Sequence, residues 1–161
     1  MCGIAGLYNT DNSKSRQERE TLGIALERAI AHRGPDAEDI WHDSESSLTL
    51  LHRRLAIIDL SDAGRQPMIS HSGRFVITYN GEIYNFQSLC KELFEAGVKF
   101  KSRSDTEVML AAFEQWGVGQ ALHKLNGMFA IVLWDRKERQ LHFIRDRFGK
   151  KPLYVGWVGK D

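Results

Sequence analysis

An uninterrupted apolar run at residues 128–134 sets the strongest limit on the fold. The run reads Met-Phe-Ala-Ile-Val-Leu-Trp without polar alternation, so we expect a strand that is buried on both faces. It is far shorter than the roughly 20 residues that a membrane span needs. Turn residues at 135–138 and a second strand-like segment at 140–145 predict a hairpin. Two-faced burial in a hairpin-connected chain predicts stacked sheets with helices outside, an α+β sandwich.

Three helices are expected from their start signals. One begins with a capping box at Ser15 and Glu18, carries Leu22 and other apolar residues at helical spacing, and ends near His32. The second is capped by Asn85 and ended by Gly97. The third begins with a capping box at residues 104–107. Further strands are expected at residues 2–9, 38–42, 48–51, 55–60, 74–80 and 152–157, with 38–42 and 48–51 forming a hairpin and a turn at Asn80-Gly81.

Composition excludes several classes of protein. The chain has 161 residues, the size of one domain, and its net charge of +1 offers no basic surface for nucleic acid. The two cysteines, Cys2 and Cys90, are too few for a disulfide scaffold or a thiolate zinc site, and the six histidines show no metal-ligand spacing. No basic segment precedes an apolar one at the start, so we expect no leader, no membrane contact and a reducing, cytoplasmic location.

Cys2 follows the initiator methionine directly, and small residues follow it. If Met1 is removed, Cys2 carries a thiol and a free α-amine, and an amine with a pKa of about 8 can act as the base for that thiol. By position alone, a small core residue is the more common explanation. Cys90 lies among apolar residues of the second expected helix and is expected to be a structural thiol.

Three other polar groups are candidates for a site. The Asn80 amide and the Gly81 N–H could both point at one oxyanion, Arg53 or Arg54 could bind a carboxylate, and Asp105 could bind an ammonium group. Taken singly, each is more typical of ordinary structure: a turn, a surface pair and a helix-dipole contact.

Considered together and in order, the motifs resemble a known family. They are Met-Cys-Gly-Ile at 1–4, His-Arg-Gly-Pro-Asp at 32–36, Arg-Leu-Ala-Ile-Ile-Asp at 54–59, Gln-Pro at 66–67, Tyr-Asn-Gly-Glu-Ile-Tyr-Asn at 79–85, Ser-Asp-Thr-Glu at 104–107, Asn-Gly-Met-Phe-Ala at 126–130 and Arg-Asp-Arg-Phe-Gly-Lys-Lys-Pro-Leu-Tyr at 145–154. This series resembles the glutaminase domain of glutamine-hydrolysing asparagine synthetases, which are class II glutamine amidotransferases among the N-terminal-nucleophile hydrolases. The resemblance runs from Cys2 to Tyr154.

The resemblance implies a four-layer α-β-β-α sandwich and hydrolysis of L-glutamine to glutamate and ammonia. Cys2 would be the nucleophile, with its own amine as base, and Asn80 and Gly81 would form the oxyanion hole. Arg54, which directly precedes the Leu-Ala-Ile-Ile-Asp run, would bind the substrate carboxylate, and Asp105 the ammonium. The pocket would be lined by Leu55, Ala56, Ile57, Ile58 and Glu82.

The family normally continues into an ATP-dependent synthetase domain, which amidates aspartate with the ammonia and would need ATP and magnesium. That domain is absent here, so we expect residues 1–161 to be one type 2 amidotransferase domain, truncated at its C-terminal end, with no cofactor or metal of its own. The expected partners are L-glutamine and the C-terminal synthetase domain, and a homodimer is compatible with the resemblance. The alternatives are an amidotransferase for a different acceptor, and a non-catalytic binding or assembly domain of the same fold.

Overall fold

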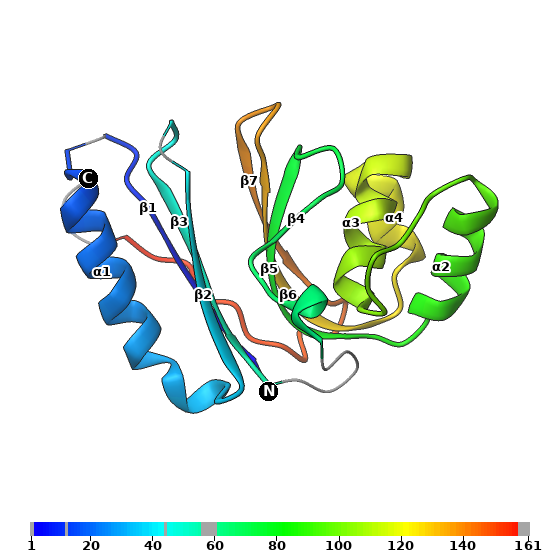
Figure 1. The fold of residues 1–161 in the computed structure, drawn as a ribbon, viewed down its shortest axis with the longest axis horizontal. Helices are drawn as coiled ribbons and strands as arrows, with labels where there is room; N and C mark the ends of the chain where they lie inside the picture. Colours follow the sequence, from blue (N-terminus) through cyan, green and yellow to red (C-terminus); the bar gives the residue numbers. More distant parts are fainter. Residues whose placement is uncertain (1, 12, 44, 56–60, 158–161) are drawn as a thin grey trace.

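The chain folds into four layers, with two β-sheets face to face and helices on both outer sides (Figure 1). The computed structural model describes residues 2–11, 13–43, 45–55 and 61–157. One helix covers the first sheet, and three cover the second. The predicted α-β-β-α sandwich is therefore confirmed. Within the described ranges, no helix has both the length and the apolar character that crossing a membrane requires.

The first sheet contains three antiparallel strands in the order β1-β3-β2. β1 spans Gly3–Tyr8, β2 Ala37–Asp43 and β3 Leu48–Arg54. β2 and β3 form the predicted hairpin, and β1 pairs with the other side of β3 so that Gly3 lies opposite Arg53. Of the strand expected at 55–60, only Leu55 is among the described residues, and it lies outside any strand.

Helix α1, Arg16–Ala29, begins at the predicted capping box and lies on the outer face of the first sheet (Figure 1). It stops before the expected end near His32, and a short 3-10 turn at Ala31–Arg33 follows. The expected apolar contact face is wrong in part, because Leu22 is 38% exposed. The helix is instead buried at Gly23 and Glu27, and the Glu27 carboxylate forms an ion pair with Arg53 of β3.

The second sheet has four antiparallel strands in the order β4-β5-β6-β7. β4 spans Met68–Ile69, β5 Phe75–Ile83, β6 Gly127–Asp135 and β7 Gln140–Arg145. The hairpin of β6 and β7 is as predicted. β4 was not predicted, because two residues are too few to show a strand pattern.

Strand β5 continues through Asn80 and Gly81, where the sequence predicts a turn. Asn80 pairs with Ala130 and Gly81 with Phe129 in an unbroken ladder. A Cβ atom on Gly81 would lie 2.1 Å from the carbonyl oxygen of Met128. Glycine is needed here because β6 approaches closely, so the turn prediction is wrong.

Three helices cover the outer face of the second sheet: α2 at Phe86–Glu95, α3 at Asp105–Trp116 and α4 at Val118–Lys124. α2 ends just before Gly97, whose φ of +91° is the left-handed conformation that favours glycine. The sequence did not predict α4, since its seven residues lack a start signal.

Of the two other expected helix caps, the one at Ser104 forms in part and the one at Asn85 does not form. Ser104 accepts the N–H of Glu107 as a capping residue should, but the Glu107 carboxylate accepts from the backbone of Lys101 and Ser102 instead of completing the box. Asn85 precedes α2 without capping it. Its side chain instead donates to the Lys124 carbonyl and accepts from an N–H beyond α4, which ties the start of α2 to the end of α4.

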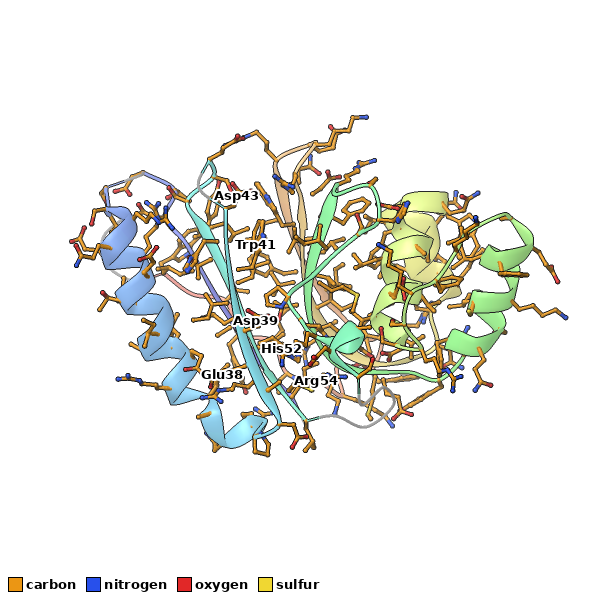
Figure 2. All side chains as sticks on the ribbon, in the orientation of Figure 1. Glu38, Asp39, Trp41, Asp43, His52 and Arg54 are labelled. Carbon is orange, nitrogen blue, oxygen red and sulfur yellow. The ribbon has the colours of Figure 1, made fainter. Side chains whose placement is uncertain are left out.

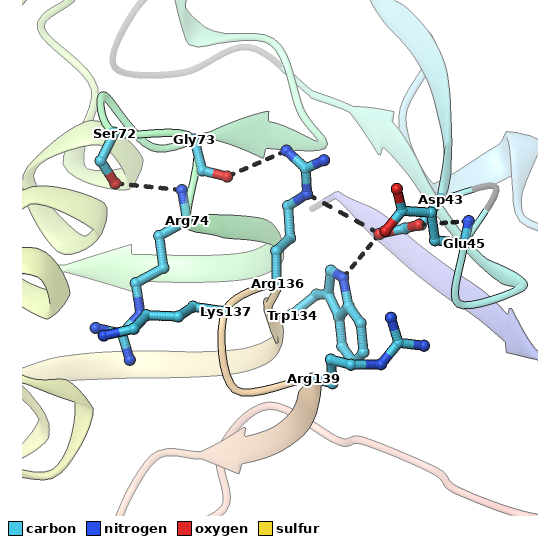
Figure 3. A pocket seen from close by; sticks show the side chains of 9 residues that line it. All are labelled: Asp43, Glu45, Ser72, Gly73, Arg74, Trp134, Arg136, Lys137 and Arg139. Atoms are coloured by element: carbon cyan, nitrogen blue, oxygen red, sulfur yellow. Dashed lines mark hydrogen bonds and ion pairs between the residues drawn. The ribbon is translucent and has the colours of Figure 1, made fainter.

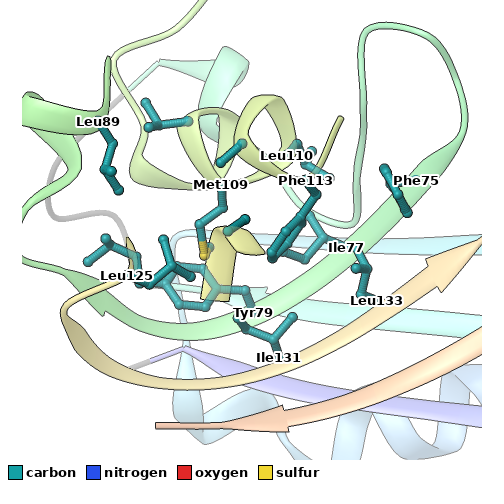
Figure 4. Packing of buried hydrophobic residues seen from close by; sticks show 14 of the residues in the cluster. Phe75, Ile77, Tyr79, Leu89, Met109, Leu110, Phe113, Leu125, Ile131 and Leu133 are labelled. Atoms are coloured by element: carbon teal, nitrogen blue, oxygen red, sulfur yellow. The ribbon is translucent and has the colours of Figure 1, made fainter. Parts of the chain in front are cut away.

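Strand β6 lies at the centre of the core, as its continuous apolar sequence predicts. Phe129, Ile131 and Leu133 pack in the cluster beneath α2, α3 and α4 (Figure 4). Val132 and Trp134 point the other way, into a smaller cluster between the sheets. Burial on both faces, at about 1.5–3 kcal/mol for each large apolar side chain, makes this strand part of both apolar clusters.

The segment 152–157, expected to be a strand, has no strand structure. Leu153 packs against the cluster between the sheets, but Tyr154 is 91% and Trp157 80% exposed. Among the described residues no strand pairs with this segment. Strand propensity without a neighbouring ladder is insufficient to form a strand.

Candidate active site

Cys2 lies directly before β1, beside the end of β3. Since Gly3 pairs with Arg53, the register sets Cys2 level with Arg54. The backbone N–H of Leu55 donates to the Cys2 Sγ over 3.4 Å, and the same sulfur lies 3.6 Å from the Leu55 carbonyl oxygen. The half-buried thiol is therefore held in direction by one residue of the neighbouring strand end.

The motif at 32–36 borders this end of β1. A Cβ atom on Gly3 would lie 2.9 Å from the Cβ of Arg33, so the turn after α1 packs tightly over the residue that follows Cys2. The N–H of Asp36 donates to the Arg54 carbonyl over 3.0 Å. The loop thus covers the strand ends that carry Cys2 and Arg54.

The edge of β5 that faces β4 is open beyond Ile77, because β4 pairs only with residues 76 and 77. Successive N–H groups of an antiparallel strand point to opposite sides. The N–H of Tyr84 donates to Asn126 on the side of β6. The N–H groups at 79, 81 and 83 therefore point to the open edge.

Two of these three edge N–H groups are paired with side chains. The N–H of Tyr79 donates to Oε1 of Gln66 over 2.7 Å. The N–H of Ile83 donates to Oδ2 of Asp105 over 3.0 Å. The N–H of Gly81 lies between them and has no hydrogen-bond partner among the described residues. A single donor is thus left for a ligand, with an occupied position on each side.

The Asn80 side chain points into the space between the sheets. Thr78, two residues earlier on the same face, donates from Oγ1 to the Leu51 carbonyl in the first sheet. Asn80 is 6% exposed. Its amide therefore faces the strands β1 and β3 that lead to Cys2, and β1 contacts β5 across this space.

Asp105, the first residue of α3, lies against the end of β5. Its Oδ2 accepts the Tyr79 hydroxyl over 2.7 Å as well as the Ile83 N–H. Burial raises the pKa of Asp105 above its usual value, Glu82 adds to the rise, and the donors at Ile83, Tyr79 and the Thr106 amide oppose it. The carboxylate is buried beside the oxyanion candidates and is under-stabilised as an anion.

The two neighbouring arginines of β3 point to opposite faces of the sheet. Arg53 faces α1, where it pairs with Glu27 and, over 2.5 Å, with Glu38. Arg54 lies on the inner face beside His52 (Figure 2), is 8% exposed and donates from Nη1 to the Ser61 carbonyl over 2.8 Å. Of the two, only Arg54 lies on the side of the sheet that faces Asn80.

The expected lining residues are less fully described. Leu55 is half-buried and in contact with Cys2, and Glu82 is exposed beyond the end of the inter-sheet face. Ala56, Ile57 and Ile58 lie outside the described residues. The glutamine pocket predicted from these residues therefore stays a prediction.

One cavity lies elsewhere in the fold. It holds about 350 Å³ and opens where the β2–β3, β4–β5 and β6–β7 hairpins meet (Figure 3). Two of its cations form ion pairs nearby: Arg74 with Asp135, and Arg136 with Asp43. None of the predicted site residues lines it, so it does not serve the candidate active site.

Three residues of the site, Gln66, His52 and Tyr79, were not assigned a role from the sequence. Gln66 pairs with the edge of β5 and donates from Nε2 to Thr106, beside Asp105. The Nε2 of His52 lies 3.2 Å from the Tyr79 carbonyl, and burial lowers the pKa of His52 to about 4, so the neutral ring donates there. The one available signal was spacing, since His52 and Arg54 share a face of β3.

The chain is similar to known proteins over nearly its whole length. A family model described as a glutamine amidotransferase domain matches residues 1–161. Asparagine synthetase 1 of Bacillus subtilis is 39% identical over 154 residues, 96% of this chain, and asparagine synthetase 1 of Arabidopsis thaliana is 36% identical over 158 residues, 98% of this chain. The amidase chry2 of Gibberella zeae is 38% identical over 162 residues, 96% of this chain.

The chain spans only about a quarter of each of these relatives, 24%, 26% and 24% respectively. A solved structure of a glutamine phosphoribosylpyrophosphate amidotransferase from Bacillus subtilis has a TM-score of 0.73. It covers 99% of this chain and 40% of its own, at 21% identity. This likeness supports the fold alone.

Proposed function

This chain belongs to the family of glutamine amidotransferase domains, and we propose that it hydrolyses L-glutamine to glutamate and ammonia through a thioester at Cys2. The observation that carries the proposal is the free N–H of Gly81 on the open edge of β5, between two paired neighbours. The Asp105 carboxylate lies beside this N–H, and the Cys2 thiol lies across the sandwich from it. A thiol, an oxyanion donor and an ammonium acceptor are the groups this reaction needs.

The proposed chemistry begins once Met1 has been removed. The α-amine of Cys2 takes the proton of its own thiol, and the thiolate attacks the side-chain amide carbon of glutamine. The resulting oxyanion accepts hydrogen bonds from the Gly81 N–H and the Asn80 amide. The amine returns its proton to the departing ammonia, leaving a γ-glutamyl thioester. Water, deprotonated by the same amine, then attacks the thioester and releases glutamate with the free thiol.

Two charged residues would bind the amino-acid end of glutamine. The Arg54 guanidinium, on the inner face of β3, suits the substrate carboxylate, since its planar donors match two oxygens. Asp105 would accept the ammonium. Leu55 and Glu82 would border the pocket with residues 56–58. The neutral His52 beside Arg54 adds no competing charge.

We further propose that the ammonia serves an ATP-dependent synthetase domain which amidates aspartate. Support comes from relatives named glutamine-hydrolysing asparagine synthetases, of which this chain spans about a quarter. ATP and magnesium would belong to that second domain. An amidase among the relatives at 38% identity favours, as a second candidate, an amidation of another acceptor. A cytoplasmic location and a homodimer remain expectations of the family resemblance.

The decisive test measures glutamate release from L-glutamine by protein whose intact mass shows that Met1 is gone. We expect turnover, complete loss of it in Cys2→Ala, and wild-type rates in Cys90→Ala. Cys90 is a matched control because it is partly buried against the core of α2, and burial raises the pKa of its thiol. A glutamine-like electrophile should label Cys2 alone.

Two outcomes would contradict the proposal. Equal rates in Cys2→Ala and wild type would exclude the nucleophile, and an inert processed protein that fails to bind glutamine would favour a non-catalytic domain. The acceptor is tested separately, by adding ATP, magnesium and aspartate to the longest available form of the protein. Asparagine formation supports the synthetase proposal, and its absence with continued glutamine hydrolysis favours another acceptor.

A further inference from the structure

Tyr79, the residue directly before the Asn80–Gly81 pair, is held at all three of its polar groups. Its N–H donates to Gln66 over 2.7 Å, and its carbonyl lies 3.2 Å from Nε2 of His52. Its hydroxyl donates to Oδ2 of Asp105 over 2.7 Å. These contacts come from three different parts of the fold: the segment before β4, strand β3 and helix α3. Tyr79 thus links the oxyanion candidates to the candidate ammonium acceptor.

Apolar packing does not explain why residue 79 carries a hydroxyl group. The ring is 3% exposed and belongs to the apolar cluster beneath α3. A hydroxyl buried in apolar surroundings is costly unless it is hydrogen-bonded, and here its partner is Asp105. Burial, followed by the charge of Asp105, raises the pKa of Tyr79 far above its usual range, so the phenol keeps its proton and remains a donor.

Asp105 receives its two short hydrogen bonds, of 3.0 Å or less, on the same oxygen. Both the Tyr79 hydroxyl and the Ile83 N–H reach Oδ2. An ionised carboxylate can accept at both oxygens, so Oδ1 is the one that can turn to a substrate. The charged and titratable groups that act on Asp105 are Tyr79 and Glu82 of β5, and Cys2, directly before β1, acts in turn on Tyr79.

We propose that Tyr79 is a positioning residue of the glutaminase site: its hydroxyl fixes the Asp105 carboxylate so that Oδ1 accepts the α-ammonium group of glutamine. The proposal rests on the proposed function, in which Asp105 binds that group. A hydrogen bond to an ionised group favours the ionised form. Tyr79 therefore does two things for Asp105: it sets the direction of the carboxylate and keeps it charged at the pH of the reaction.

The test is the single-atom change Tyr79→Phe, made in a Cys2→Ala background so that L-glutamine binds without turnover. Calorimetry across about pH 5–8 gives the dissociation constant of glutamine at each pH. Affinity falls as pH decreases, because protonated Asp105 cannot accept an ammonium. In Tyr79→Phe we expect the affinity for glutamine to fall at a pH about one unit higher than in the protein with Tyr79. At the acidic end of the range, the variant should bind glutamine about tenfold more weakly. At the alkaline side the two proteins should converge.

With Cys2 restored, the same variant should raise KM and leave kcat within about twofold, because Asp105 contacts glutamine equally before and during the reaction.

The matched control is Ile131→Val. Ile131 lies opposite Tyr79 on β6, is fully buried in the same cluster and has no polar atom. Removing one methylene should lower thermal stability while leaving the affinity for glutamine and its pH dependence unchanged. A Tyr79→Phe protein that behaves like Ile131→Val, with lower stability and a wild-type pH dependence, would overturn the proposal.

Asp105→Asn separates this inference from the proposed function. If Asp105→Asn binds glutamine as wild type does, the assignment of Asp105 fails, and the role of Tyr79 fails with it. If Asp105→Asn loses affinity but Tyr79→Phe keeps the wild-type pH dependence, only the positioning role is refuted.

Discussion

Asp105 and Asp146 lie at opposite ends of the second half of the chain and are equally shielded from solvent, at 5% exposure each. They differ in their hydrogen bonds and in the direction in which their pKa is shifted. Asp146 follows β7, and its carboxylate accepts four backbone N–H groups, two on each oxygen. Burial alone would raise the pKa of Asp146, but these donors lower it to about 2. Asp105 has two short hydrogen bonds, both on one oxygen, and its pKa is raised.

The difference shows how a buried carboxylate becomes either a structural part or a binding group. At Asp146 every oxygen is satisfied by the chain, so the charge stabilises the turn that it organises. At Asp105 the chain leaves one oxygen for a ligand and accepts a less stable anion in return. Both side chains are shielded from solvent, but Asp105 lies deeper in the protein, so the depth of burial and the count of donors together distinguish the two carboxylates. The predictions below test that distinction.

The largest effect is expected from Asp105→Asn. Loss of the charged contact to the substrate ammonium should lower kcat/KM about 100-fold. The unfolding free energy near pH 7 should not fall, because a raised pKa means that the charged form costs stability above that pKa, and the amide oxygen still accepts from Tyr79 or Ile83. Steady-state kinetics and urea unfolding measure the two quantities. Joint loss of stability and activity would make Asp105 a structural residue like Asp146.

Asp146→Asn should show the reverse pattern. An amide accepts on one oxygen only, so two of the four backbone donors, those of Phe129 and Lys151 or those of Phe148 and Lys150, lose their acceptor. At about 1–3 kcal/mol for each unsatisfied group, the protein should lose about 3 kcal/mol and Tm should fall by about 10 °C. Calorimetry checks the stability. The folded variant should keep kcat/KM within about twofold, and a larger loss would break the comparison.

The pH dependence of stability should separate the two residues further. Asp146 has a lowered pKa in the folded state, so its contribution is present above the usual value of 3.8 and is lost as pH falls toward about 2. The stability difference between wild type and Asp146→Asn should therefore shrink between about pH 4 and pH 2. For Asp105, whose pKa is raised, the wild type should instead gain on Asp105→Asn as the carboxyl becomes protonated. Urea unfolding at several pH values tests both signs.

The smallest effect is expected from Phe148→Ala. The backbone N–H of Phe148 donates to Asp146, while its side chain is 88% exposed. Truncating an exposed side chain leaves the backbone donor in place, so the unfolding free energy should change by no more than about 0.5 kcal/mol. A loss as large as that of Asp146→Asn would show that side chains, rather than backbone donors, hold the turn.

The layers of the fold were predictable from the sequence because local signals agreed with the global packing. The capping box at Ser15 and Glu18 and the continuous apolar run of β6 both have their expected structures. The continuation of β5 through Asn80-Gly81, where a turn was expected, was not predictable. Glycine is needed there because of the Met128 carbonyl, which lies on a strand about 50 residues later. The strand expected at 152–157 failed in a similar way, because strand structure depends on a partner.

The candidate site was predictable where a residue type carries its own chemistry. Cys2, with a thiol and an amine on one carbon, is an example, and the register of β1 and β3 sets it level with Arg54. The roles of Tyr79, His52 and Gln66 were not predictable, because they arise only when β3, β5 and α3 meet. A tyrosine before Asn-Gly resembles any apolar strand residue until its hydroxyl is found on a carboxylate.

The unbroken course of β5 determines when the Gly81 N–H becomes oriented. A donor in a turn or a mobile loop would have to be immobilised during each catalytic cycle, and that entropy would raise the barrier. The Gly81 N–H is instead part of a strand whose ladder to β6 continues on both sides of it. Its orientation is set when the protein folds. Under the proposed function, the reorganisation that glutamine hydrolysis would otherwise require is therefore complete before any substrate arrives.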